Sequence, residues 1–166
     1  AVSAELAKAF KKRGIASKVG TKVTSAKVKS GEVHIEMADG AGKTESLVVD
    51  VLLVATGRGP VTEGLGAKEV GLAIDERGYI KVDKDFRTNV AGISAIGDVI
   101  TFGTGAHAQL AHLSSAEGVN LAERIAGKNP PPINYDQIPG CTYCDPEIGS
   151  IGLTDRKSTR LNSSHT

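Results

Sequence analysis

Apolar and polar residues alternate along the early part of the chain with the period of a half-exposed β-strand. Three runs follow this period: 22–29, 32–38 and 45–48. In the second run Val33, Ile35 and Met37 alternate with polar residues, so one face of the strand should be wet. Ser30-Gly31 lies between the first two runs and predicts a hairpin turn. The pattern predicts a small antiparallel meander.

Two later runs are apolar at almost every position, which is typical of parallel strands covered on both faces. Residues 51–55 end abruptly at Thr56-Gly57, and residues 92–96 end at Gly97-Asp98. A shorter strand is expected at 79–82. In open α/β sheets, ligands bind beyond the carboxyl ends of such strands. We therefore expect an α/β protein with ligand sites at both of these strand ends.

Helical spacing of apolar residues occurs twice. The first helix is expected from Ser3, a suitable N-cap, to Arg13, with Gly14 as its stop. The second is expected over residues 107–126, and the proline triplet 130–132 prevents its continuation. That triplet also indicates a linker. Two strands beyond it, at about 140–143 and 150–153, suggest the opening of a further domain.

Composition and charge narrow the possible partners. The chain has 166 residues and a formal net charge of +1, which is too small for binding nucleic acid through a basic field. No apolar run approaches the roughly 20 residues of a membrane-spanning helix, so no membrane partner is expected. The two cysteines favour free thiols in a reducing compartment, and a cytoplasmic location is expected.

Both ends suggest a piece of a longer protein. The chain opens at Ala1 and its only methionine is Met37, so we expect an upstream part to be missing. Residues 155–166 contain one apolar side chain, Leu161, and follow neither a helical nor a strand period. This stretch resembles the translation of a DNA-sequencing adaptor read through in frame. The alternative is a polar, frayed tail.

Asp98 is the first candidate for chemistry. It follows an expected buried strand and precedes the longer helix, so its carboxylate could accept a hydrogen bond from a sugar hydroxyl while the helix end favours nearby negative charge. This combination suits a nucleotide or a flavin. The alternative is that Asp98 only caps the turn.

Several motifs occur in a characteristic order. They are Ala55-Thr56-Gly57-Arg58, Thr88 to Val99 ending in Gly97-Asp98-Val99, Leu110-Ala111-His112, Glu117-Gly118, Ile138 to Tyr143, and Asp145-Pro146-Glu147. In this order they resemble the flavoprotein disulfide reductases with two dinucleotide-binding domains, from about residue 1 to Thr154. Within that group the chain is most similar to the dihydrolipoamide dehydrogenases, class I members of the pyridine nucleotide-disulfide oxidoreductases.

The resemblance implies roles for seven residues. Asp98 would bind the ribityl chain of FAD, Gly57 would lie against NAD, and the backbone of Val23 would meet the adenine end of the nucleotide. Four residues would line the flavin at the start of the helix: Gln109, Leu110, Ala111 and His112. The chain departs from the family pattern at Gly59, where a second basic residue is usual, so no charge role is assigned there. The loop over 99–108 is also longer than is usual in the family.

The resemblance also implies a fold: an α/β chain with parts of two Rossmann-like dinucleotide-binding domains and the start of an α+β dimerisation domain. We expect four segments. Residues 1–58 would be the C-terminal half of the NAD-binding domain, 59–132 the central segment that completes the FAD domain, 133–154 the start of the dimerisation domain, and 155–166 the adaptor-derived tail.

The implied activity is the oxidation of protein-bound dihydrolipoamide with NAD+, through a redox disulfide and FAD. The implied partners are the lipoyl-bearing acyltransferase of 2-oxo acid dehydrogenase complexes and a second copy in a homodimer. The redox cysteine pair would lie upstream and the His–Glu base downstream, so no residue of this chain is assigned as catalytic. Two alternatives stay open: a sister reductase acting on glutathione or mercuric ion, or a nucleotide-binding fragment without catalysis.

Other signals are given less weight. Residues 103–108 satisfy Gly-x-Gly-x-x-Ala, but no acidic strand end follows about 20 residues later, so a dinucleotide fingerprint is not favoured. Cys141 and Cys144 have CxxC spacing, yet on a strand their side chains point to opposite faces, which favours two separate thiols. His107 shows no carboxylate partner at helical spacing, since Glu117 would lie on a different face. His112 is expected to have a positioning role.

Overall fold

The computed structural model describes residues 2–103 and 107–152. The chain divides into two compact units: the first contains residues up to Thr56 together with Cys141–Gly149, and the second contains Gly57–Gly140 and the residues from Ser150 onward. Each unit is described by itself.

The first helix, α1 (Val2–Lys12), ends in a Schellman motif. Gly14 has a φ of +75° and donates its N–H to the carbonyl of Lys11, while the N–H of Ile15 reaches the carbonyl of Phe10 at 2.9 Å. Glycine adopts this left-handed conformation without the steric cost of a Cβ. The stop expected at Gly14 is therefore confirmed.

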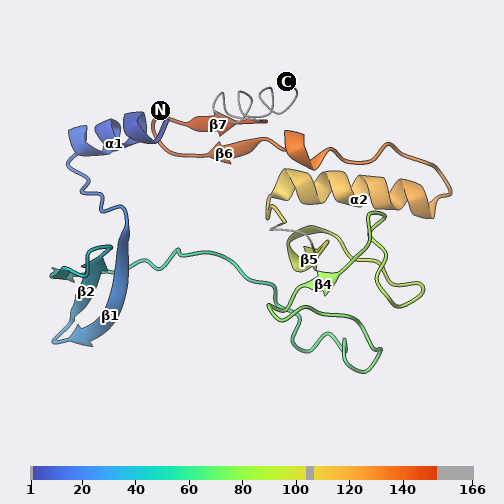
Figure 1. The fold of residues 1–166 in the computed structure, drawn as a ribbon, viewed down its shortest axis with the longest axis horizontal. Coiled ribbons are helices and arrows are strands. Elements are labelled where there is room, and N and C mark those ends of the chain that lie inside the picture. Colours follow the sequence, from blue (N-terminus) through green and yellow to red (C-terminus); the bar gives the residue numbers. More distant parts are fainter. Residues whose placement is uncertain (1, 104–106, 153–166) are drawn as a thin grey trace, which may run out of the picture. The chain divides into compact units, whose positions relative to one another are not determined.

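Three antiparallel strands form the meander of the first unit, in the order β1-β2-β3 (Figure 1). They are β1 (Thr21–Lys29), β2 (Glu32–Asp39) and β3 (Thr44–Val49). Ser30 and Gly31 both have positive φ, as a type I′ hairpin turn requires. Ile35 and Met37 on the central strand are the buried side chains, so the alternation predicted for this strand is confirmed.

The second unit is built around one helix and a short parallel pair. Ile80–Lys81 (β4) pairs with Ile100–Thr101 (β5), preceded by the 3-10 turn Gly97–Val99 (η1), and the helix α2 (Ala111–Ile125) lies beside this segment (Figure 1). Its most deeply buried apolar side chains are Ile80, Phe86, Ile100 and Leu113. This core carries the turn and the helix that form the candidate site.

After α2 the chain forms a second 3-10 turn and a two-stranded sheet. The elements are η2 (Tyr135–Gln137), β6 (Gly140–Thr142) and β7 (Ile148–Ser150), with the sheet order β6-β7. The two strands expected beyond the proline triplet are thus present, the second starting two residues earlier than predicted.

Two predicted strands are wrong. Residues 51–55 form no strand, and Val51, Leu53 and Val54 are 80%, 85% and 70% exposed. Residues 92–96 form no strand either, apart from an isolated bridge between Ser94 and Arg87. A parallel strand needs hydrogen-bonding neighbours and cover on both faces, and the described part of the chain supplies neither to residues 51–55.

The longer helix begins later than predicted. α2 starts at Ala111, whereas the sequence pattern predicted a start at 107. Residues 107–110 lie outside the helix, which changes what His107 can contact. The fingerprint-like segment 103–108 includes residues 104–106, which lie outside the described residues.

Candidate functional site

The turn that precedes β5 depends on a glycine. Gly97 has a φ of +79°, and a Cβ there would lie 3.2 Å from the Oγ of Ser114 and 3.3 Å from its Cβ. A side chain at this position would be strained by the backbone conformation and would crowd Ser114 of α2. Gly97 therefore lets the turn approach α2 closely and places the next residue, Asp98, against the start of that helix.

Asp98 is held from three sides. Its Oδ2 accepts a hydrogen bond from Nη1 of Arg58 at 2.7 Å, and its Oδ1 lies 3.5 Å from the Oγ of Ser114. Its backbone carbonyl accepts from Nε2 of Gln109 at 3.0 Å. The carboxylate still has 37% of its side-chain surface exposed, so it has room and lone pairs for a further hydrogen-bond donor.

The start of α2 is uncapped. Leu110 occupies the N-cap position, no side chain of the described residues caps it, and the first turn contains no acidic residue. The first N–H groups of a helix lack partners within the helix and carry a partial positive charge. The beginning of α2, beside Asp98, is therefore suited to a group that carries or develops negative charge.

The same helix carries a buried carboxylate, Glu117, whose side chain is 0% exposed. Its Oε2 accepts from the N–H of Gly97 at 2.7 Å. Its Oε1 lies 2.8 Å from Nε2 of His107 and accepts from the hydroxyl of Tyr135 at 2.9 Å. A carboxylate can only accept, so Nε2 of His107 carries the proton in this pair. Three segments of the chain thus converge on one side chain.

The environment of Tyr135 affects its acidity. Burial of its hydroxyl raises the pKa of Tyr135, and the hydrogen bond to Glu117 and the negative charge of that carboxylate raise it further. The ring also packs edge-on against Phe102, with centroids 5.2 Å apart. Tyr135 is therefore a donor to Glu117 over the whole neutral range of pH.

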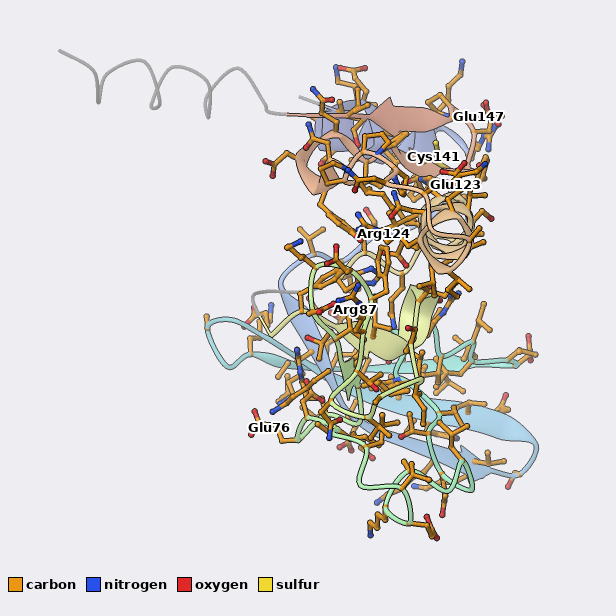
Figure 2. All side chains as sticks on the ribbon, turned by 90° about the vertical axis from the view of Figure 1, so that its right-hand side faces the viewer. Glu76, Arg87, Glu123, Arg124, Cys141 and Glu147 are labelled. Atoms are coloured by element: carbon orange, nitrogen blue, oxygen red, sulfur yellow. The ribbon has the colours of Figure 1, made fainter. Side chains whose placement is uncertain are left out.

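A cavity of about 540 Å³ borders this cluster, with an aromatic wall formed by Phe86, Phe102 and Tyr135. Arg124 also lines it and is one of the α2 residues labelled in Figure 2. Its guanidinium is occupied by Asp85 Oδ1 and Asn120 Oδ1, both at 2.8 Å. The Arg124 cation is thus committed to internal contacts.

Comparison with known proteins identifies the family. The sequence profile of the pyridine nucleotide-disulphide oxidoreductases matches residues 1–118, well over half of the chain. The chain belongs to this family. Its relatives include the dihydrolipoyl dehydrogenase of Trypanosoma brucei brucei, 44% identical over 123 residues that cover 74% of this chain and 25% of that protein. The dihydrolipoyl dehydrogenase of Corynebacterium glutamicum is 38% identical over 159 residues, 95% of this chain and 33% of that protein.

Solved structures agree with this membership. LpdA from Mycobacterium tuberculosis matches with a TM-score of 0.79 and 25% identity, over 95% of this chain and 32% of that one. The flavoprotein disulfide reductase RclA from Escherichia coli matches with a TM-score of 0.78 and 24% identity, over 93% of this chain and 34% of that one, which shows the fold alone. The α/β fold class with partial Rossmann-like domains is confirmed. The chain spans about a quarter to a third of the length of these relatives.

For this pyridine nucleotide-disulphide oxidoreductase chain, the structure brings together most of the expected flavin residues. Asp98 and Gln109 are hydrogen-bonded, and Leu110, Ala111 and His112 follow directly at the start of α2. Nε2 of His112 lies 2.9 Å from the carbonyl of Pro139, which fixes the ring. Their roles toward a cofactor remain predictions.

The two residues expected near NAD belong to different units of the chain. Val23 is 52% exposed on β1 of the first unit, where the register with β2 shifts between Val23 and Ser25. Gly57 begins the second unit and has a φ of +144°. Their roles also remain predictions.

The expectation that His107 lacks a carboxylate partner is wrong. Because α2 begins only at Ala111, helical spacing does not apply to His107, and the preceding loop turns its ring onto Glu117. Sequence reasoning also missed Glu117 itself as a site residue. The signal was present: Glu117 lies four residues after Leu113 and four before Leu121, so it interrupts the apolar stripe of the helix.

The interpretation of the cysteine spacing can be compared with the structure. Cys141 and Cys144 are free thiols, in agreement with the interpretation of their CxxC spacing. Over residues 2–103 and 107–152, no group of three or more potential ligands could hold a metal ion. No helix in that same part of the chain is long and apolar enough to cross a membrane.

Proposed function

We propose that this chain is part of an FAD-dependent, NAD-linked oxidoreductase that oxidises protein-bound dihydrolipoamide. The support is the similarity to proteins named dihydrolipoyl dehydrogenase, at 38% to 44% identity over most of the chain. Because the chain spans only about a third of those proteins or less, the activity is proposed for the whole protein. No residue of this chain is assigned a catalytic role.

The observation that carries the proposal is the Asp98 carboxylate beside the uncapped start of α2. A flavin nucleotide offers ribityl hydroxyls, which donate hydrogen bonds, and a ring edge at N1 and C2=O, which gains negative charge on reduction. The exposed part of Asp98 and the positive end of α2 match these two needs. The residues present therefore fit FAD.

Each side chain then has a defined task. Asp98 would accept a hydrogen bond from a ribityl hydroxyl, and Gln109 would keep the Asp98 carbonyl in place. Leu110, Ala111 and His112 would line the ring at the start of α2, whose dipole would stabilise the reduced form. When bound, FAD supplies the transfer of two electrons between a dithiol–disulfide pair and nicotinamide.

For the second cofactor, NAD, we propose Gly57 and Val23 as binding residues. Gly57 adopts a φ of +144°, a conformation that favours glycine and lets a ligand approach the backbone. Val23 lies next to an irregularity of β1, and such irregularities expose backbone groups that the ladder does not use. Both features support the assignment.

The same proposal divides the chain at 58 and 132, with a dimerisation segment at 133–154. The N-terminal stretch of the first compact unit ends at Thr56, two residues before the proposed boundary, which supports the division there. The proposed partners are a lipoyl-bearing acyltransferase of a 2-oxo acid dehydrogenase complex and a second copy of the protein. The free thiols Cys141 and Cys144 support a cytoplasmic location.

The test uses the full-length protein, cloned after its gene has been read beyond both ends of this chain. We expect the purified protein to carry FAD and to reduce NAD+ with dihydrolipoamide. Faster reduction of glutathione disulfide or mercuric ion would favour a sister reductase instead. A protein that binds a nucleotide but transfers no electrons would refute the proposed activity.

A further inference from the structure

The buried carboxylate of Glu117 links three segments that are distant in sequence. Its donors are Gly97 in the turn η1, His107 in the loop before α2, and Tyr135 in η2, which lie 20, 10 and 18 residues away. A fully buried carboxylate is tolerated only when hydrogen bonds replace the water it has lost. Movement of any of the three segments would leave this charge unsatisfied, so the carboxylate fixes them relative to one another.

The shortest of these hydrogen bonds comes from the turn η1, which contains Asp98. The N–H of Gly97 lies 2.7 Å from Oε2 of Glu117, and hydrogen bonds to a charged acceptor are stronger than those between neutral groups. Gly97 directly precedes Asp98. The position of the Asp98 backbone, and with it the direction of its carboxylate, therefore depends on Glu117.

Among the described residues, the His107 side chain makes no hydrogen bond other than the one to Glu117. The His107 side chain is only 4% exposed, and its Nδ1 has no hydrogen-bond partner in the part of the chain that the structure describes. Its position is set by Nε2 and by ring contacts with Phe102 and Tyr135. Glu117 consequently also fixes the loop that leads to Gln109, the residue that holds the Asp98 carbonyl.

We propose that Glu117 is the positioning residue of the flavin site: it holds the Gly97–Asp98 turn and the loop before α2 in the geometry that binds the ribityl chain of FAD. This inference rests on the proposed function for the identity of the ligand. The rival explanation is a purely structural role, in which Glu117 stabilises the unit without affecting the ligand site in particular.

The test compares two conservative substitutions on the same helix in the full-length protein. Glu117→Gln keeps the size of the side chain but removes the negative charge that strengthens its hydrogen bonds to Gly97, His107 and Tyr135. Glu123→Gln makes the same change at a position of α2 where the side chain is 41% exposed; Glu123 is labelled in Figure 2. Both variants are compared with the wild type in FAD titrations and in thermal unfolding of the apoprotein.

We expect Glu117→Gln to weaken FAD binding roughly tenfold or more, because the hydrogen bond from Gly97 and the two other bonds lose their charged acceptor. Its flavin absorption spectrum should also shift, because the ring edge would meet a displaced helix start. Glu123→Gln should stay within about twofold of the wild type, the usual result of removing an exposed charge. Equal FAD affinity and an unchanged spectrum in Glu117→Gln and wild type would overturn the proposal.

Hydrogen exchange separates positioning from general stability without using the cofactor. In apo Glu117→Gln, exchange should accelerate in peptides that contain residues 97–99 and remain unchanged in peptides that contain residues 66–72, another part of the second unit. Equal acceleration in both sets of peptides would support the purely structural role and overturn the proposal.

If Glu117→Gln does not fold, Tyr135→Phe takes its place, because it removes one donor and keeps the ring packed against Phe102. It should weaken FAD binding in the same direction but less, and unchanged FAD affinity in this variant would overturn the proposal. A wild-type protein that binds no FAD would refute the proposed function, whereas loss of positioning would still be visible in the exchange at 97–99.

Discussion

Phe86 combines two features that oppose each other. Its ring is only 2% exposed, which stabilises the second unit, but its φ of +65° lies in the left-handed region that residues with a Cβ avoid. The backbone is held there from both sides: the N–H of Phe86 donates to the carbonyl of Asp83 at 3.0 Å, and the Phe86 carbonyl accepts from Ala95 at 3.1 Å. The conformation should therefore persist when the side chain is replaced.

Replacing Phe86 by alanine and by glycine separates the two contributions. Both remove the ring, and a buried Phe→Ala change costs about 3–5 kcal/mol. Alanine keeps the left-handed strain of about 1–2 kcal/mol, which glycine relieves, while the extra freedom of glycine in the unfolded chain costs about 0.4–1 kcal/mol. Phe86→Gly should therefore equal Phe86→Ala in stability or exceed it by up to about 1.5 kcal/mol.

Leu113 provides the matched control, since it is 1% exposed in the first turn of α2 with ordinary helical geometry. Leu113→Ala should cost about 2–5 kcal/mol, and Leu113→Gly up to about 1 kcal/mol more, because glycine disfavours the helix. The ranking of alanine and glycine should thus be opposite at the two positions.

The assay is urea unfolding followed by tyrosine fluorescence. The chain contains no tryptophan, and Tyr79 and Tyr135 both report on the second unit. Free energies of unfolding come from linear extrapolation with a common slope. If Phe86→Gly proves less stable than Phe86→Ala by as much as Leu113→Gly falls below Leu113→Ala, the strain argument is refuted.

Three further predictions follow from the site. The raised pKa of Tyr135 means that the unfolded chain loses this proton near pH 10 while the folded chain keeps it, so stability should fall as the pH rises above about 10. In a spectroscopic titration, one tyrosine should ionise at a higher pH than the other two, and this late transition should be absent in Tyr135→Phe. Three identical midpoints would contradict the prediction. Arg58→Ala should change the free energy of unfolding by only about 0.2–1 kcal/mol, because the side chain of Arg58 is 67% exposed, and a loss well beyond that in urea unfolding would show a larger role. The 166-residue chain titrated alone with FAD should show no tight stoichiometric binding, since it supplies only part of the proposed site; a stoichiometric endpoint in the flavin fluorescence would disprove that.

Local signals were sufficient for the first hairpin and for the end of the first helix. The alternation of Val33, Ile35 and Met37 and the Ser30-Gly31 step predicted the β1–β2 hairpin, because strand period and turn conformation depend on residues close in sequence. Gly14 predicted the end of α1 for the same reason. The order of motifs along the chain was also enough to indicate the family, which the sequence profile then confirmed.

The tertiary structure decided what depends on contacts between distant segments. Residues 51–55 have the composition of a buried strand, yet they are exposed, because strand pairing and cover must come from other segments. His107 and Glu117 are ten residues apart, and only the start of α2 at Ala111 allows the loop to bring them within 2.8 Å. The sequence alone determined the local elements and the family, whereas the closure of three segments on one buried carboxylate follows from packing, since an isolated charge is stable there only when the whole unit surrounds it.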